Sequence, residues 1–317
     1  MKKTAIVSCA LVISLAAGIF TGCSKASAPK PGTDRAGNPI TVPAEVKKIV
    51  SLNPAITQTL IDMGQKDKIV GIDEYSAEYK DQLSSDVAVY SLDTPDQESI
   101  INLKPDIMFT SGMLYVGGAN PYQTVSDAGI CIADIPSSTS IKGIQEDIVF
   151  VGDCIGETEQ ASKIVESMNK EIVNISSIAN NIKDEDKKSV AFFLSVPTDD
   201  YPTVYSVGKN TFMDEMITAI GAKNVFGDQD SWLALSEEDV IASNPDVILH
   251  SVSYMDDVTG ALATRPGWDT IKAVSDGNIF YINENASNRP NAHITEAMIE
   301  MAQAVYPEYY AALEKAA

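Results

Sequence analysis

Two carboxylates stand at matching places in the sequence. Glu98 opens the stretch ESIINLKPDIMF and Glu238 opens EDVIASNPDVIL, and in both units a Pro, an Asp and an apolar run follow at the same spacing. The two units lie 140 positions apart. A carboxylate at the start of a helix is favoured by the helix dipole and can stay in contact with water. The spacing therefore predicts two exposed acids at equivalent places of a duplicated unit. The simpler interpretation is that both acids only stabilise helix starts.

The residues around each acid alternate between strand and helix patterns. In the first half, the β-branched runs KKIVSL, KIVGI and DIMFTS are separated by the helical patterns AITQTLIDMG and QESIINLK. In the second half, VAFFLS, TFMDEMITAIG, EEDVIASN and DVILHS repeat this order. The alternation predicts an α/β fold of two Rossmann-like lobes with parallel sheets. Ligands of such sheets bind beyond the carboxyl ends of the strands, so we expect a ligand cleft between the lobes.

A long helical segment separates the two halves. Residues 157–183 contain no Gly or Pro, and their apolar residues recur at helical spacing. Such a helix would be roughly 40 Å long, and it either connects both lobes or packs on one of them. We expect an N-terminal lobe at 41–156, a connecting helix at 157–183 and a C-terminal lobe at 184–317.

The first residues, MKKTAIVSCALVISLAAGIFTGC, have the pattern of an export signal, which we assign to 1–22. The stretch FTGC resembles a bacterial lipobox, so Cys23 is the expected lipidation site, followed by a flexible tether up to residue 40. The mature chain would carry a net charge of −23, because Lys2 and Lys3 leave with the signal. This charge argues against nucleic acid or anionic lipid as a partner.

The remaining cysteines, Cys131 and Cys154, either form a disulfide or stay as buried thiols. No Cys or His spacing matches a zinc site, and two His in the whole chain are too few for a metal cluster built on imidazole.

The chain resembles the substrate-binding lipoproteins of ABC importers for ferric siderophores, haem and cobalamin. The resemblance covers nearly the whole mature chain and rests on the order of DRAGNPITVP, KKIVSLNPAITQTLIDMG, SVGKNTFMDEMITAIGAKNVF, LSEEDVIASNPDVI and RPGWDTIKAVSDGNIFYI. It implies a monomeric protein, held on the outer face of the cell membrane by lipid alone. This protein would carry a metal chelate to a permease dimer that is powered by a separate ATPase. In the family, one Glu per lobe docks on Arg residues of the permease, and Glu98 and Glu238 hold those positions.

Large chelates bind through aromatic faces and a few polar groups. The residues of strand ends and loops that we expect to bind ligand are Tyr75, Tyr115, Tyr122, Tyr205, Trp232, Tyr254, Arg265, Trp268 and Arg289. Any one of the aromatic residues can instead be ordinary packing, and Arg289 can simply anchor its loop. His250, at the end of DVILHS, is a weak candidate for a metal ligand, and a hydrogen-bonded strand-end His is the favoured interpretation. The scarcity of cations in these loops favours a corrinoid, haem or a neutral chelate.

Two functions other than transport are an exported hydrolase and a surface sensor or adhesin. An exported hydrolase is disfavoured because the sequence contains no G-x-S-x-G, H-E-x-x-H, G-x-x-x-x-G-K or G-x-G-x-x-G motif, and we expect no enzymatic activity and no resident cofactor. A surface sensor or adhesin would use the same fold without a permease.

Overall fold

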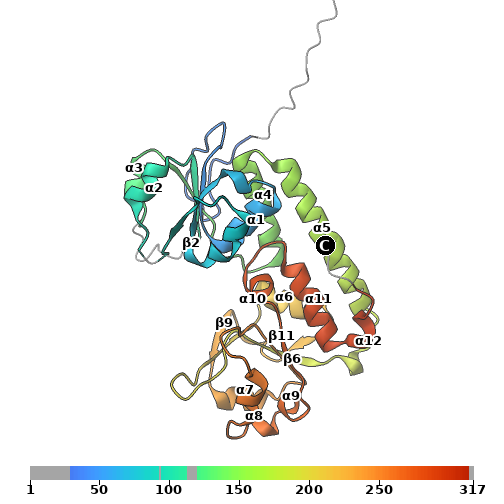
Figure 1. The fold of residues 1–317 in the computed structure, drawn as a ribbon. Coiled ribbons are helices and arrows are strands. Elements are labelled where there is room, and N and C mark those ends of the chain that lie inside the picture. The colour runs from blue at the N-terminus through green and yellow to red at the C-terminus, as the bar shows by residue number, and fades with distance from the viewer. Residues whose placement is uncertain (1–28, 93, 113–119, 314–317) are drawn as a thin grey trace, which may run out of the picture.

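The N-terminal lobe is built on a five-stranded parallel sheet (Figure 1). The computed structural model describes residues 29–92, 94–112 and 120–313. The strand order is β3-β2-β1-β4-β5, and the strands are β1 (Ile49–Leu52), β2 (Ile69–Asp73), β3 (Ala88–Tyr90), β4 (Ile107–Thr110) and β5 (Cys131–Asp134). The elements between and after them are α1 (Pro54–Asp62), the 3₁₀ helix η2 (Glu74–Gln82), α2 (Gln97–Leu103), α3 (Gln123–Asp127) and α4 (Ile141–Ile155).

The C-terminal lobe has a mixed sheet. Its strands are β6 (Ser189–Phe193), β7 (Val204–Val207), β8 (Lys223–Asn224), β9 (Trp232–Leu235), β10 (Val247–His250) and β11 (Ile279–Tyr281), and its helices are α6 (Phe212–Ala219), α7 (Glu237–Ser243), α8 (Val258–Ala263), α9 (Lys272–Ser275), α10 (Glu284–Asn288), α11 (Ile294–Val305) and α12 (Pro307–Tyr310). The predicted α/β fold of two lobes is confirmed, but the second sheet is not wholly parallel, since β7 runs antiparallel to both β6 and β9. The reason is the connection from β6 to β7, which contains no helix to carry the chain back across the sheet.

The duplicated unit folds the same way in both lobes. Asp96 accepts a hydrogen bond from the backbone of Ser99 at the start of α2, and Ser236 forms a capping box with Asp239 at the start of α7. At the other end of these helices, Lys104 and Asn244 adopt left-handed backbone conformations, with φ of 53° and 42°. A Pro follows each of them and prevents the helix from continuing.

The two lobes are joined along one side by helices (Figure 1). The connecting helix α5 spans Thr158–Ala179, ends a few residues before the predicted boundary, and packs against α4 of the first lobe and against α6, α11 and α12 of the second. One hydrophobic core includes buried residues of both lobes, such as Ile49 and Phe192. A shared core of this kind resists large movements of one lobe against the other.

The sequence predicted a flexible tether up to residue 40, but part of this segment is bound to the N-terminal lobe. Lys30 Nζ donates a hydrogen bond to the Cys154 carbonyl at 2.8 Å. Arg35 forms ion pairs with Glu146 and Asp147 of α4, at 3.1 and 2.5 Å. These long-range contacts, which no local pattern reveals, fix residues 30–40 on the N-terminal lobe. Among the described helices, none combines the length and the apolar character that a bilayer crossing requires.

Candidate functional site

Glu98 and Glu238 are both exposed, in the first turn of α2 and α7. Within the described residues, neither side chain has an assigned hydrogen bond or ion pair. Glu238 also borders a surface pocket of about 450 Å³, which Pro202, Thr203 and residues 234–238 line. Each lobe therefore presents an unpaired carboxylate to solvent at the same place of the duplicated unit, available for a cationic partner.

The neighbouring acid Glu237 has a different environment. Arg265 binds its two oxygens with two hydrogen bonds of 2.6 and 2.7 Å, and the Trp268 indole N–H donates a third, of 2.7 Å. The hydrogen bonds from Arg265, partly opposed by burial, and the bond from Trp268 lower the pKa of Glu237. Glu237 therefore stays ionised and fixed within the lobe.

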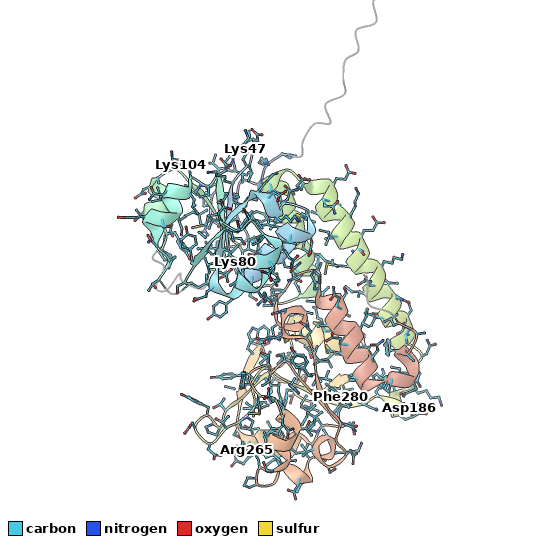
Figure 2. All side chains as sticks on the ribbon, viewed as in Figure 1. Lys47, Lys80, Lys104, Asp186, Arg265 and Phe280 are labelled. Carbon is cyan, nitrogen blue, oxygen red and sulfur yellow. The ribbon has the colours of Figure 1, made fainter. Side chains whose placement is uncertain are left out.

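This cluster corrects the predicted ligand contact of Trp268 and gives Arg265 a partner within the lobe. Trp268 is completely buried and stands edge-on to Phe193, with 6.2 Å between the ring centroids. Arg265 is neutralised by Glu237 and lies in the C-terminal lobe near α7 and α8 (Figure 2). Both residues stabilise the lobe. In the described conformation the Trp268 ring has no exposed face that a ligand could contact, and Glu237 already balances the charge of Arg265. The sequence could not reveal this, because 28 and 31 positions separate them from Glu237.

Exposed aromatic side chains lie at or near strand ends in both sheets. Tyr75 is the second residue of η2, which follows β2 directly. Tyr205 lies in β7 beside the end of β6, and Tyr254 follows β10. Trp232 opens β9 and stands edge-on to Phe212. The exposed fraction of these four side chains is between 44% and 66%. Large aromatic residues are mostly buried in proteins, so several exposed ones near strand ends indicate a binding surface.

Tyr281 joins this group, although the sequence analysis did not select it. It ends β11, pairs with His250 in the sheet and is 52% exposed, with 5.7 Å between the centroids of the two rings. Its signal was present, since it closes the strand pattern NIFYI.

Among the predicted residues Tyr115, Tyr122 and Cys23, the structure places only Tyr122. Tyr122 is 2% exposed and belongs to the core of the N-terminal lobe, because α3 packs it against the sheet, so its ring does not line a cleft. Tyr115 and the lipidation site Cys23 lie outside the described residues.

His250 is buried at the end of β10, and its Nδ1 accepts a hydrogen bond of 3.3 Å from the Val252 backbone. Burial lowers its pKa, which favours a neutral imidazole. It lines a pocket of about 290 Å³ together with Asp256, Asp257 and Tyr281. In the part of the chain that the structure describes, no group of three or more His, Cys, Asp or Glu side chains could hold a metal ion.

Arg289 lies where the two lobes meet. It donates a 2.5 Å hydrogen bond to the Tyr79 hydroxyl and a 3.2 Å bond to the Tyr75 carbonyl, and it pairs with Glu78. The sequence left two roles open for Arg289, which were contact with a ligand and anchoring of its loop. In the structure it acts as an anchor, and its partners lie in the other lobe rather than in its own loop.

Cys131 and Cys154 are free thiols in the structure. Burial raises the pKa of both, to about 11 for Cys131 and further for Cys154. Thiols in this state are protonated and unreactive at neutral pH.

The comparisons with known proteins agree with this geometry. The family model described as periplasmic binding protein matches residues 49–286. The uncharacterized ABC transporter substrate-binding lipoprotein YvrC of Bacillus subtilis is 31% identical, over 98% of this chain and 99% of its own. The cobalamin-binding protein of Halobacterium salinarum is 28% identical, over 86% of this chain and 73% of its own.

Solved structures show the same arrangement of lobes. The periplasmic heme-binding protein RhuT from Roseiflexus sp. RS-1 superposes with a TM-score of 0.69 and 25% identity, over 83% of this chain and 99% of its own. With a family model that matches most of the chain and a relative that aligns over nearly its full length, the chain belongs to the periplasmic binding protein family, the substrate-binding proteins of ABC transporters, as the resemblance predicted.

Proposed function

We propose that this protein binds a corrinoid between its lobes and delivers it to an ABC permease. The observation that carries the proposal is the set of exposed aromatic rings near the strand ends, from Tyr75 in one lobe to Tyr205, Trp232, Tyr254 and Tyr281 in the other. Such rings cover the apolar faces and edges of a large macrocycle, and their hydroxyl and indole groups can meet its amide side chains.

Two further points support a corrinoid over a highly acidic chelate. The cobalamin-binding relative aligns with 86% of this chain. Arg289, a cation at the lobe junction, already has a carboxylate partner in Glu78. A neutral ligand suits a site whose charges are already balanced.

The test is native mass spectrometry of residues 24–317 with an equimolar mixture of cyanocobalamin, haem and ferric siderophores. We expect one retained ligand, with the mass of cyanocobalamin. If haem or a siderophore is retained instead, the proposed transport function stands, but the ligand is not a corrinoid. A folded protein that retains none of them would contradict the proposal. Recovery of a chemically altered ligand would favour an exported hydrolase, since a binding protein returns its ligand unchanged.

In the delivery step, Glu98 and Glu238 would bind basic residues on the two permease subunits. The protein would act as a monomer, lipid-anchored through Cys23 on the outer face of the membrane, and a separate ATPase would supply the energy. The equivalent positions of the two exposed acids support this arrangement, because a permease dimer offers two equivalent surfaces. A surface sensor or adhesin has no permease, so its function would not depend on these two acids.

A further inference from the structure

Glu78 forms a bridge between the lobes. It lies in η2 of the N-terminal lobe, and its two carboxylate oxygens have different partners, both from the C-terminal lobe: Oε1 pairs with Arg289 and Oε2 accepts a hydrogen bond from the Asn285 side chain. The side chains of Arg289 and Glu78 are 18% and 36% exposed. The pair is therefore partly withdrawn from water, where a charge without its partner would be costly.

The surroundings of Arg289 place this pair beside the aromatic rings. Its guanidinium lies over the Tyr79 ring at 5.4 Å from the centroid and donates to the Tyr75 carbonyl. Tyr75 follows β2, and Asn285 lies in α10, which follows β11 and Tyr281. Arg289 therefore stands between the strand-end segments of the two sheets, at the place where a ligand that bridges the lobes would meet a positive charge.

We infer that Glu78 determines the charge selectivity of the site: by occupying Arg289 it excludes ligands with carboxylate groups and admits neutral ones. This inference rests on the proposed binding of a chelate between the lobes. A ligand carboxylate has to displace Glu78 from Arg289 before it can bind, and it then leaves Glu78 without its cation and next to a second anion. A neutral ligand disturbs neither charge. Like charges placed side by side in a partly desolvated site give strong discrimination.

The experiment uses two probes that differ only in their carboxylates. Haem carries two free propionates, and its dimethyl ester carries none; both are titrated in the same detergent buffer, and cyanocobalamin is titrated separately. The proteins are the wild type and Glu78→Gln, in which the amide keeps a hydrogen-bonding group for Arg289 and Asn285. We expect the variant to bind haem at least about tenfold more tightly than the wild type does, and the ester and cyanocobalamin within about twofold.

The control is Asp81→Asn. Asp81 is exposed in the same 3₁₀ helix and has no assigned partner among the described residues, so the variant removes one negative charge without freeing Arg289. It should leave all three affinities unchanged. An equal gain from Asp81→Asn would assign the effect to net charge and overturn the inference.

The remaining outcomes separate the inference from the proposed function. If Glu78→Gln changes the affinities for haem and its ester equally, or if it changes neither, the inference is wrong, even if cyanocobalamin binds. If cyanocobalamin does not bind but Glu78→Gln gains affinity for haem alone, the corrinoid proposal fails and the charge selector stands. If no probe binds either protein, both fail, because a freed cation beside exposed aromatic rings should bind haem.

Discussion

At the scale of single residues, the two lobes repeat more than their exposed acids. Asp106 accepts hydrogen bonds from the backbone N–H groups of Lys47 and Lys48, and Asp246 accepts one from the backbone of Ser189. The two acids lie 140 positions apart, like Glu98 and Glu238, and each fixes the chain at or just before the first strand of its lobe. The Asp of the repeated Pro-Asp dipeptide therefore has a structural role that the sequence pattern alone did not explain.

Asp246 should stabilise the protein in a pH-dependent way. Burial would raise its pKa, but hydrogen bonds from Lys272 and Ser189 outweigh this and lower it to about 2. Because its pKa is lower in the folded state, its contribution is complete above the unfolded value and is lost as the pH falls through about 2. Asp246→Asn should reduce the free energy of unfolding by about 1–2 kcal/mol at pH 7, and by progressively less below pH 4.

Urea denaturation followed by circular dichroism between pH 7 and pH 2.5 measures this effect. Asp228→Asn is the control, since Asp228 is exposed and has no assigned partner in the described ranges. A loss of stability that does not depend on pH would contradict the assignment to the charge of Asp246.

His293 should have the opposite pH dependence. Its Nε2 lies 3.2 Å from Asp62 of the other lobe and its Nδ1 lies 2.6 Å from Glu296. The hydrogen bond to Asp62, opposed by burial and supported by both charges, raises the pKa of His293 to about 9. The stabilisation is therefore complete below the unfolded value of about 6.5 and is lost as the pH rises through about 9.

Asp62→Asn should remove most of this pKa shift. We expect the stability of the wild type to fall by about 1–2 kcal/mol between pH 6.5 and pH 9, and that of the variant to stay nearly constant. Chemical denaturation across this range tests it, with Asp67→Asn, an exposed neighbour, as the control. Parallel curves for the wild type and Asp62→Asn would show that His293 is not held in its charged form.

At the scale of elements, the joint between α4 and α5 depends on a close approach. A Cβ atom added at Gly152 would lie 2.5 Å from the Ala161 Cβ and 3.1 Å from the Glu157 carbonyl oxygen. Gly156, with φ of 85°, ends α4 and lets the chain turn directly into α5. These small residues allow the connecting helix to pack against the N-terminal lobe along its first turns.

Gly152→Ala should therefore push the two helices apart and lower the free energy of unfolding by about 1–3 kcal/mol. Adding Ala161→Gly removes the closer of the two clashes, so the double variant should recover part of this loss beyond what the single changes predict. Thermal and urea denaturation of the four proteins give the interaction energy. If the effects of the two changes on the free energy of unfolding simply add, the contact between positions 152 and 161 is not the source of the strain.

At the scale of the whole molecule, the exposed acids of the two lobes are held in a fixed relation. α5 packs on both lobes, a single hydrophobic core runs through them, and Glu78 and Asp62 of one lobe bind Arg289 and His293 of the other. A rigid frame of this kind suits simultaneous contact with two permease subunits, because neither acid has to be repositioned for docking.

Reversing both charges tests this arrangement. The variant with Glu98→Lys and Glu238→Lys should bind its ligand within about twofold of the wild type, while ligand uptake falls to background, since two positive charges would then face the basic residues proposed on the permease. The matched control reverses Glu166 and Glu185, two exposed acids in α5 and beyond its end, and should leave uptake intact. Normal uptake with the first variant would show that the acids serve only as helix-start residues.

The features that depend on local physics can be predicted from the sequence. Hydrophobic period, Gly and Pro positions and the repeat at 140 residues predicted the α/β lobes, the long connecting helix and the helix starts at Glu98 and Glu238. Helix hydrogen bonds join residues close in sequence, and the alternation of side chains along a strand follows from local backbone geometry. Which side chains are accessible and which charges are paired could be seen only in the folded chain. In the structure Tyr122 and Trp268 are core residues, and Tyr281 is exposed. Arg265 forms an ion pair with Glu237, and Arg289 forms one with Glu78. Burial and ion pairing depend on segments that meet only in the folded chain.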